Sequence, residues 1–310
     1  MDHQSFERFA AETLDHLGET PRHTGFLAQG ATSRVWEIWS DQRAYVLRII
    51  DSPARTLNGP LDRFLRKWIS DRGGRVSCPV LSSDEVGTLW QGRPWTLEPL
   101  LVGRHPPRGK LPAPVCRALG ETLAALHQVP VRGFGRPAHV DGACIHGATS
   151  DPVAGLLQRF DHPLPEHWPQ DFTSPAFAAA PEIETGTHAL LQKVSARVAE
   201  RRPVICHSDL HEQQLICDGD QLVGLIDFGD ATLLDPHWDL GSVIYFHGER
   251  NFRQVFAAYQ QAARDTGCQP DLAAAFSVAI ALHHAARSRL PGKSHRLERA
   301  VAHIRQIIDT

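Results

Sequence analysis

The sequence predicts an α+β fold of two lobes, a small antiparallel β-rich lobe at residues 1–102 and a larger, mainly helical lobe at residues 103–310. Three observations predict it. Strand-like alternation dominates residues 26–50, helical periodicity dominates residues 115–129 and 250–308, and a run rich in proline and glycine separates the two parts. Strands followed by helices, rather than alternating with them, are typical of this fold class.

Two amphipathic helices are predicted in the first lobe, at residues 5–17 and 61–71, because their apolar residues recur every three to four positions. Turn residues bound the strands expected between and after these helices. Those strands cover residues 26–50 as a group of three and then residues 76–81, 86–91 and 94–98.

The second lobe begins with a predicted helix at residues 115–129, where Leu119, Leu123 and Leu126 form an apolar stripe. Residues 130–185 are rich in proline, glycine and tryptophan, and they predict a long irregular insertion shaped for a ligand. Further helices are expected at residues 187–200, 250–265, 271–289 and 295–308.

Composition excludes several classes of function. The net charge of −3 gives no basic footprint for nucleic acid, and no apolar run is long enough to span a membrane. The polar N-terminus lacks the pattern of a signal peptide. Six isolated cysteines form no CxxC pair, which argues against zinc and for a reducing compartment. We therefore expect a cytoplasmic protein, either a monomer or a homodimer.

The stretch from Ile205 to Gly229 carries the candidate chemistry. Asp209 stands in a His-x-Asp turn, Gln214 follows five residues later, and Asp227 opens an Asp-Phe-Gly. Apolar, strand-like runs separate the three positions, so the stretch predicts a short hairpin. One carboxylate for a nucleophile and two oxygen ligands for Mg²⁺ are what phosphoryl transfer needs.

Asp209 is the candidate catalytic base, because a hydroxyl that attacks a γ-phosphate needs its proton accepted and its oxygen aimed. The alternative is an aspartate that caps a turn. His211, two residues later, is a second catalytic candidate: a cationic side chain there could face the γ-phosphate, or it could be a simple polar turn residue. His207 is expected to brace the loop.

Asp227 and Gln214 are the metal candidates. Mg²⁺ prefers hard oxygen ligands, and it usually takes one or two carboxylates together with substrate phosphates. Gly229 permits an unusual backbone turn just after Asp227. The alternatives are a strand-terminal aspartate in a turn and a solvent-facing glutamine on a hairpin.

The first lobe supplies weaker candidates for binding the phosphates of a nucleotide. Gly30 to Ser33 form a turn between strands whose N–H groups and Ser33 hydroxyl could cover phosphates, although a plain hairpin turn fits equally well. Strand alternation directs Arg48 toward the cleft beneath this turn, where its guanidinium would match phosphate oxygens, whereas most strand arginines are simply solvated.

The segment 151–190 contains six acidic residues and a single basic one, Arg159. Acidic side chains beside a phosphoryl-transfer site could attract a cationic substrate, although a solvated acidic loop is the more ordinary interpretation. Trp168 and Phe172 would suit an apolar face of a ligand equally well.

Taken together, these motifs resemble the aminoglycoside phosphotransferase family, or phosphotransferase enzyme family, which has a protein-kinase-like fold. HSDLHEQQ resembles the catalytic loop His-Gly-Asp-Leu-His-x-x-Asn, and IDFGD resembles the metal-binding motif. In DPHWDLG, Asp239 would brace the catalytic loop. In LEPLLVGR, the resemblance implies an interlobe hinge whose backbone near Glu98 and Leu100 meets adenine. The resemblance covers roughly residues 22–290.

Three departures from the family pattern stand out. Gln214 replaces asparagine, Arg48 replaces the lysine that holds the nucleotide, and the small-lobe helix lacks the expected glutamate. Asp62 stands near that place, so an Arg48–Asp62 ion pair is one expectation.

The resemblance implies O-phosphorylation of a hydroxyl on a small molecule, with ATP or GTP as donor and Mg²⁺ as cofactor. The acceptor could be an aminoglycoside or another antibiotic, or a metabolite. A catalytically retired kinase fold that binds a nucleotide as a regulatory module is the alternative. A protein kinase is a weaker reading, because DPHWDLG follows IDFGD almost at once and leaves little platform for a peptide.

Overall fold

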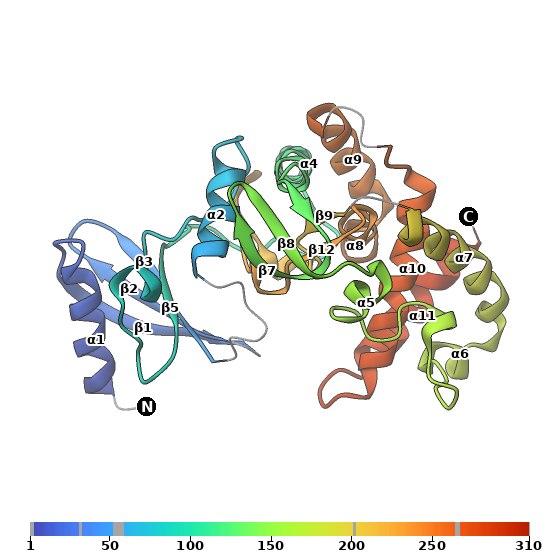
Figure 1. Ribbon diagram of the computed structural model, residues 1–310, viewed down its shortest axis with the longest axis horizontal. Helices are drawn as coiled ribbons and strands as arrows, with labels where there is room; N and C mark the ends of the chain where they lie inside the picture. Colours follow the sequence, from blue (N-terminus) through green and yellow to red (C-terminus); the bar gives the residue numbers. More distant parts are fainter. Residues whose placement is uncertain (1–2, 31–32, 52–58, 201–202, 264–266, 310) are drawn as a thin grey trace.

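The first part of the chain is a five-stranded antiparallel sheet in the computed structural model, which describes residues 3–30, 33–51, 59–200, 203–263 and 267–309. The strands lie in the order β1-β2-β3-β5-β4. Figure 1 shows this sheet at one end of the molecule and most of the helices at the other. The strands are β1 (Pro21–Gln29), β2 (Ser33–Ser40), β3 (Ala44–Ile50), β4 (Leu81–Ser82) and β5 (Trp95–Pro99).

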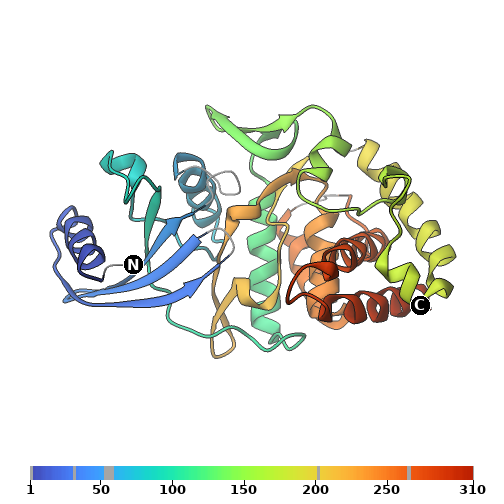
Figure 2. The same ribbon diagram turned by 90° about the horizontal axis from the view of Figure 1, so that it is seen from below.

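Helix α1 (His3–Asp15) covers one face of this sheet through its apolar stripe, as the sequence predicts (Figure 2). Phe6 is fully buried, and its ring stacks on Trp36 of β2 with centroids 4.0 Å apart. Phe9 packs against Trp90 and Trp95. Burying an aromatic side chain of this size contributes roughly 2–3 kcal/mol, so the helix holds the small sheet in shape.

Two of the strands expected in the first lobe are wrong or much shorter than predicted. The strand expected at residues 86–91 is wrong, because Val86 ends the short helix α3 (Ser83–Val86) and Trp90 forms only an isolated bridge with Arg93. Ser82 and Glu85 form a capping box at the start of α3, and Gly87 ends it with a positive φ. Of residues 76–81, only Leu81 belongs to a strand, β4, because Val76 instead bridges to Leu225 of the second lobe.

The second lobe contains a sheet that the sequence did not predict. Its strands lie in the order β6-β8-β7-β12-β9, and β7 and β8 form a hairpin inside the stretch expected to be irregular. Gly142 and Ala143 make the turn, with Gly142 at φ 59°. The strands are β6 (Val131–Arg132), β7 (Phe134–Asp141), β8 (Cys144–Thr149), β9 (Val204–Cys206) and β12 (Thr232–Leu234).

The remaining elements surround this sheet. A separate antiparallel hairpin, β10 (Leu215–Asp218) and β11 (Gln221–Leu225), lies where the motif stretch predicted one. Helix α8 was not predicted. The other α-helices, both those that the sequence predicted and those that it did not, are α2 (Gly59–Ser70), α4 (Ala113–His127), α5 (Pro152–Leu157), α6 (Pro175–Ala179), α7 (Glu184–Glu200), α8 (His237–His247), α9 (Glu249–Ala263), α10 (Pro270–Ala286) and α11 (His295–Ile308).

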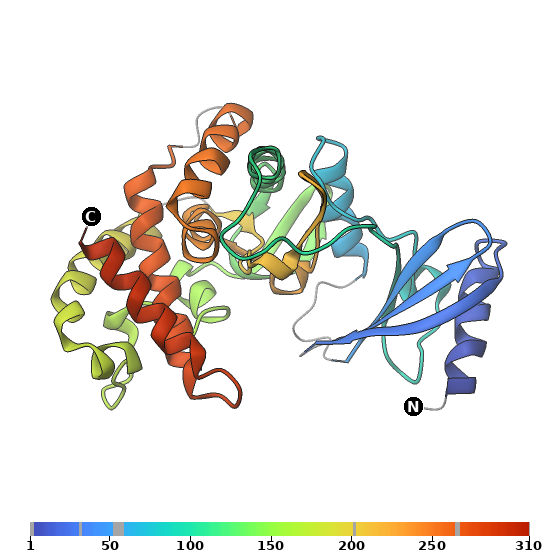
Figure 3. The same cartoon turned by 180° about the vertical axis from the view of Figure 1, so that it is seen from behind.

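Close helix packing builds the core of the second lobe. A Cβ at Gly120 of α4 would lie 2.3 Å from the carbonyl oxygen of Val255 in α9, and one at Gly241 of α8 would lie 2.8 Å from the Ser277 nitrogen of α10. Only glycine therefore permits either helix pair to approach so closely. Helices α10 and α11 lie side by side near the C-terminus (Figure 3).

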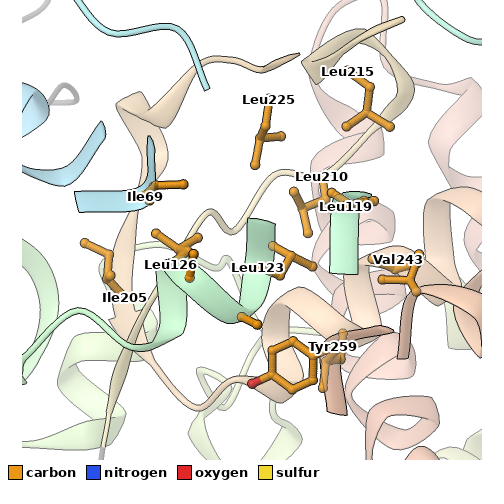
Figure 4. Packing of buried hydrophobic residues seen from close by; sticks show 14 of the residues in the cluster. Ile69, Leu119, Leu123, Leu126, Ile205, Leu210, Leu215, Leu225, Val243 and Tyr259 are labelled. Carbon is orange, nitrogen blue, oxygen red and sulfur yellow. The ribbon is translucent and has the colours of Figure 1, made fainter. Parts of the chain in front are cut away.

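The core joins the catalytic stretch to the first large helix. Leu119, Leu123 and Leu126 of α4 are buried against Leu210 and Leu225, which flank the catalytic motifs (Figure 4). Ile69 of α2 joins the same cluster, so the small-lobe helix is anchored to the large lobe. Across the described residues, no helix has both the length and the hydropathy needed to cross a membrane.

Candidate active site

The candidate catalytic loop, residues 207–214, begins where β9 ends and is held by a carboxylate from α8. Asp239 is fully buried and accepts hydrogen bonds from the backbone nitrogens of His207 and Ser208, both at 2.8 Å. His127 of α4 contacts the same carboxylate through Nε2 at 3.1 Å. Because a buried carboxylate needs such donors, the loop and the helices fix each other. This is the bracing contact expected of Asp239.

Asp209 and His211 lie together at the end of this loop. His211 Nε2 is 3.6 Å from Asp209 Oδ2, and the Asp209 side chain is 29% exposed. Burial alone would raise the pKa of Asp209, but the nearby His211 imidazole and the charge of Arg159 outweigh it and hold the pKa below its usual range. Burial lowers the pKa of His211, but the carboxylates of Asp209, Glu212 and Asp227 together raise it above its usual value. Asp209 is therefore ionised at neutral pH.

Ser208 has a backbone conformation that is rare for a residue with a side chain, with φ at 64°. Its Oγ donates to the carbonyl oxygen of Asp230 at 2.6 Å and accepts from Arg159 Nε at 2.9 Å. Arg159 Nη2 also donates to the Ser208 carbonyl oxygen at 2.8 Å. These hydrogen bonds offset the strain and fix the residue directly before Asp209.

Arg159 reaches this position from the turn after α5, with only 6% of its side chain exposed. Its Nη2 lies 3.9 Å from Asp209 Oδ1 and 3.5 Å from Asp230 Oδ2. A buried guanidinium of this kind binds best when carboxylates and carbonyls satisfy its donors, and here both do. Arg159 therefore supplies a fixed positive charge beside the candidate base.

Asp227 lies on the other side of the cluster and also has a left-handed backbone, with φ and ψ at 65°. Arg48 extends from β3 of the small lobe, and its Nη1 is 3.2 Å from Asp227 Oδ1. Burial would raise the pKa of Asp227, but the charges of Arg48 and His207 lower it overall. The strand alternation directed Arg48 into the cleft, and the structure gives it this carboxylate as a partner.

Gln214 connects the two halves of the cluster. Its amide group lies 3.1 Å from His211 Nε2 and 3.5 Å from Asp227 Oδ2. Together with the His211–Asp209 contact, these distances form a continuous chain from one carboxylate to the other. A half-turn of the amide would put its oxygen between His211 and Asp227, where it could accept from the imidazole and face a cation.

The expected Arg48–Asp62 pair is wrong. Asp62 instead accepts from Arg66, four residues later in α2, at 2.9 Å. Arg66 also donates to the Glu98 carboxylate at 2.9 Å, and all three residues are buried. Asp62 is taken by its own helix because an (i, i+4) pair is already in register, whereas Arg48 faces Asp227.

The Arg66 network also contacts the motif that carries Asp227. The guanidinium carbon of Arg66 lies 5.4 Å from the centroid of the Phe228 ring, within range of a cation–π interaction. Phe228 is buried directly after Asp227 and packs against His207. Helix α2 thus contacts the Asp-Phe-Gly segment through an arginine rather than through a glutamate.

The remaining nucleotide candidates are placed only in part. The Gly30 nitrogen donates to the Ser33 carbonyl oxygen at 2.9 Å, which closes the turn, while residues 31–32 lie outside the described residues. Leu100 donates its N–H to the Ala44 carbonyl oxygen at 2.9 Å, so this donor is not free for adenine. Glu98 directs its side chain to Arg66, which leaves only its backbone for the predicted role.

The acidic residues of the insertion are not gathered beside Asp209. Asp151 caps the start of α5, Glu182 pairs with Arg305, and Glu166 bonds to Ser195. Asp161 is paired instead with Arg287, whose Nε lies 3.7 Å from Asp161 Oδ2. The expectation of a cationic substrate therefore lacks the acidic wall on which it depended.

Sequence reasoning missed Arg159, Ser208 and Arg66 as site residues. A signal existed for Arg159, because it is the single basic residue in an acidic segment. Another existed for Ser208, because it stands where the resembled family has glycine. No signal in the sequence ties Arg66 to Phe228, since 162 positions separate them along the chain.

A braced loop with one carboxylate, a second carboxylate on a left-handed turn and a cation from a small β lobe define a kinase-like phosphotransferase fold. Comparison with known proteins agrees. Residues 24–275 match the family model described as "Phosphotransferase enzyme family", and the chain belongs to that family.

A curated relative and solved structures are also similar to the chain. N-acetylmuramate/N-acetylglucosamine kinase of Caulobacter vibrioides is 30% identical over 202 residues, which is 62% of this chain and 52% of that protein. The chain thus spans about half the length of this relative. Aminoglycoside phosphotransferase APH(4)-Ia has a TM-score of 0.64 at 16% identity, covering 99% of this chain and 98% of that one. Spectinomycin phosphotransferase APH(9)-Ia, solved with ADP and spectinomycin, has a TM-score of 0.58 at 13% identity, covering 97% and 96%.

Proposed function

We propose that this protein transfers the γ-phosphoryl group of ATP or GTP to a hydroxyl of a small molecule. The observation that carries the proposal is the continuous set of contacts from Asp209 through His211 and Gln214 to Asp227. These contacts bring one carboxylate for the acceptor hydroxyl and one for the nucleotide donor into a single cluster. Family membership supports the same reaction class.

On the acceptor side, ionised Asp209 orients the attacking hydroxyl. It receives the proton late, because its pKa is low and it is a weak base. His211 keeps a proton near the place where the transferred group passes, since Asp209 raises its pKa. Positioning and electrostatic stabilisation account for most of the rate enhancement in phosphoryl transfer.

On the donor side, the residues fit a hard divalent cation. Asp227 is 44% exposed and offers carboxylate oxygens, and Gln214 offers an amide oxygen once its side chain turns. The guanidinium of Arg48 lies beside Asp227 Oδ1, and the buried Nε of Arg48 has no partner among the described residues. Mg²⁺ bound there would neutralise phosphate charge, and Arg48 would be released to hold a phosphate oxygen. The Gly30 turn, Ser33, the backbone at Glu98 and the carbonyl oxygen of Leu100, whose N–H is bonded to Ala44, would bind the rest of the nucleotide.

For the acceptor we propose a sugar or amino sugar. The Caulobacter vibrioides relative is named for phosphorylating N-acetylmuramate and N-acetylglucosamine, and this is support from similarity alone. Aminoglycosides remain a second class, because APH(4)-Ia structures with hygromycin B share the fold. A reducing cytoplasm is the compartment we propose, and the absence of disulfide bonds among the described cysteines agrees with it.

One observation favours a second function, a nucleotide-binding regulator without activity. Arg48 occupies Asp227 directly, and a permanent ion pair there would exclude a metal. Retention of Asp209 beside the cluster favours the enzyme.

The test is a phosphorylation screen of amino sugars, sugars and aminoglycosides with ATP and with GTP, followed by mass spectrometry of the product. Asp209→Asn should lower turnover of any active acceptor by about 10²–10⁴-fold while the nucleotide still binds. Asp220→Asn, an exposed carboxylate at the turn of the β10–β11 hairpin, is the matched control. Equal turnover in Asp209→Asn and the wild type would refute the assignment, and no turnover with any acceptor would favour the regulator.

A further inference from the structure

Four half-buried arginines of the second lobe influence one another or Tyr245 electrostatically. They come from the loop before α4, from the turn η6 (Arg287–Arg289) after α10, and from α11. We call this set the arginine basin: Arg108, Arg287, Arg296 and Arg299. No acidic wall balances it, and the reaction proposed above gives it no role.

Helical spacing directs two of these arginines inward. Arg296, Arg299 and His303 lie three, four and seven positions apart on α11, so they share one face. His303 contacts Ser277 Oγ at 2.8 Å, and its ring lies 5.1 Å from that of Tyr245 in α8. The shared face is therefore turned toward α8 and α10.

Helix α8 connects this face to the catalytic loop. His247 Nε2 donates to the Leu210 carbonyl oxygen at 2.9 Å, one residue after Asp209. The Phe246 ring lies 5.8 Å from that of His211 and 5.4 Å from the guanidinium of Arg108. The Phe246 ring thus lies between Arg108 of the basin and His211.

The charges of the basin are only partly balanced within the protein, by Glu212 near Arg108, Asp209 near Arg296 and Asp161 near Arg287. Arg296 and Arg299 form no ion pair with any residue that the structure describes, and Arg287 has only the distant contact with Asp161. Burial lowers the pKa of Arg296, and the charge of Arg287 lowers it further. Burial lowers the pKa of Arg108, and so does the charge of Arg299. These cations repel one another, and a bound anion would remove that repulsion.

An unsatisfied hydroxyl lies in the same place. Tyr245 is 5% exposed, and its buried oxygen has no hydrogen-bond partner in the described part of the chain. Burial raises the pKa of Tyr245 to about 12, so the hydroxyl keeps its proton as a donor. Arginine side chains offer donors only, and a donor beside them lacks an acceptor. A ligand oxygen that displaced the side chains covering this hydroxyl would supply the missing acceptor.

We propose that the acceptor is an anion, a hydroxylated compound whose carboxylate or phosphate binds the arginine basin while its hydroxyl reaches Asp209. The inference rests on the function proposed above and names the acceptor class for that site. Guanidinium groups bind carboxylates and phosphates through paired, charge-assisted hydrogen bonds. An anionic acceptor replaces the cationic acceptor that the acidic residues of the segment 151–190 suggested.

The test measures binding of matched compounds to the full chain with saturating ADP and Mg²⁺, so that the nucleotide site is filled. The probes are glucuronate against glucose, an amino sugar with an ether-linked lactyl carboxylate against the same sugar without it, and glucose 6-phosphate as the phosphate arm. At least one anion should bind tenfold or more tightly than its neutral partner, and 0.5 M salt should remove most of the difference.

Variants locate the site. Arg296→Gln with Arg299→Gln should reduce the preference for the anion at least tenfold, measured as the ratio of the two dissociation constants. Arg253→Gln is the matched control, because Arg253 is an exposed arginine on α9 paired with Glu249. Thermal unfolding checks that each variant folds. The preference of the wild-type protein for anions is measured without any variant, so it can be tested even if a variant fails to fold.

The outcomes separate this inference from the proposed function. Equal or tighter binding of the neutral partners, or no binding of any anion, overturns the anionic acceptor even if a neutral sugar is phosphorylated. Preference for anions without any phosphoryl transfer supports the basin and overturns the proposed reaction. A preference that survives the double variant places the anion elsewhere and overturns the assignment to the basin.

Discussion

Replacing Arg159 by glutamine should damage the catalytic loop without touching either reacting partner. The side chain donates to the Ser208 carbonyl oxygen at 2.8 Å and to Ser208 Oγ at 2.9 Å, and only 6% of it is exposed. A net hydrogen bond from a charged donor contributes about 1.5–3 kcal/mol, and the carbonyl left unpaired costs about 1–3 kcal/mol. Since glutamine can restore part of one bond, we expect a loss of about 2–4 kcal/mol in unfolding free energy.

The activity of Arg159→Gln should also fall, because the loop that holds Asp209 is displaced. A displacement of Asp209 worth about 1.4–2.8 kcal/mol in the transition state corresponds to a 10- to 100-fold decrease in kcat/KM. The pH profile should change as well. Arg159 helps to hold the pKa of Asp209 low, so its removal raises that pKa and moves the acidic limb of kcat/KM toward neutral pH. Steady-state kinetics from pH 5 to 9 and urea unfolding measure both effects.

Ser208→Gly gives this prediction a control within the loop. Glycine relieves the strain of φ 64°, worth about 1 kcal/mol or more, and removes the hydroxyl that Arg159 contacts. The two substitutions should therefore be non-additive by at least about 0.5 kcal/mol. Arg305→Gln, which breaks an exposed pair with Glu182, should cost about 0–1 kcal/mol. Additive effects with an unchanged pH profile would refute the reasoning.

Three other substitutions have defined outcomes. Asp239→Asn should cost about 3–5 kcal/mol of unfolding free energy, because the buried carboxylate accepts three hydrogen bonds; a loss below 1 kcal/mol in urea titrations would contradict this. His211→Asn should remove the alkaline limb of kcat/KM. Because the pKa of His211 is raised in the folded state, protonated His211 stabilises the fold below about pH 6.5, and this contribution is lost as the pH rises through the folded-state pKa. The variant should therefore lose the most unfolding free energy in acid and the least at pH 9. An equal loss at every pH would contradict this prediction. Arg48→Met should raise the nucleotide KM at least tenfold, and an unchanged KM would leave Arg48 as a partner of Asp227 only.

The sequence predicted the parts of the site that are close together along the chain. Asp209, Gln214 and Asp227 lie within 19 residues, and the β10–β11 hairpin returns the chain so that the last two come within 3.5 Å. Alternation along a strand also predicted the direction of Arg48. Local spacing is enough for these because hairpins and strands have fixed periods.

Contacts between distant segments could not be predicted in the same way. Arg48 was expected to pair with Asp62, but register within α2 gave Asp62 to Arg66. The basin joins residues 108 and 287–299, which no local pattern relates. The number of acidic residues in 151–190 suggested a cationic acceptor, but Glu182 of this segment is paired with Arg305, which lies far away in the sequence. The β7–β8 hairpin was missed because proline and glycine inside its strands hide their alternation.

The most direct measurement of the central claim compares nucleotide binding and single-turnover transfer in the Asp209→Asn and Asp227→Asn variants across a Mg²⁺ titration. Asp209→Asn should keep Mg²⁺-dependent nucleotide affinity while transfer falls at least 100-fold. Asp227→Asn should lose the dependence of nucleotide affinity on Mg²⁺. Dependence on Mg²⁺ that persists in Asp227→Asn, or transfer by Asp209→Asn at the wild-type rate, would contradict the division of the site into a donor and an acceptor carboxylate.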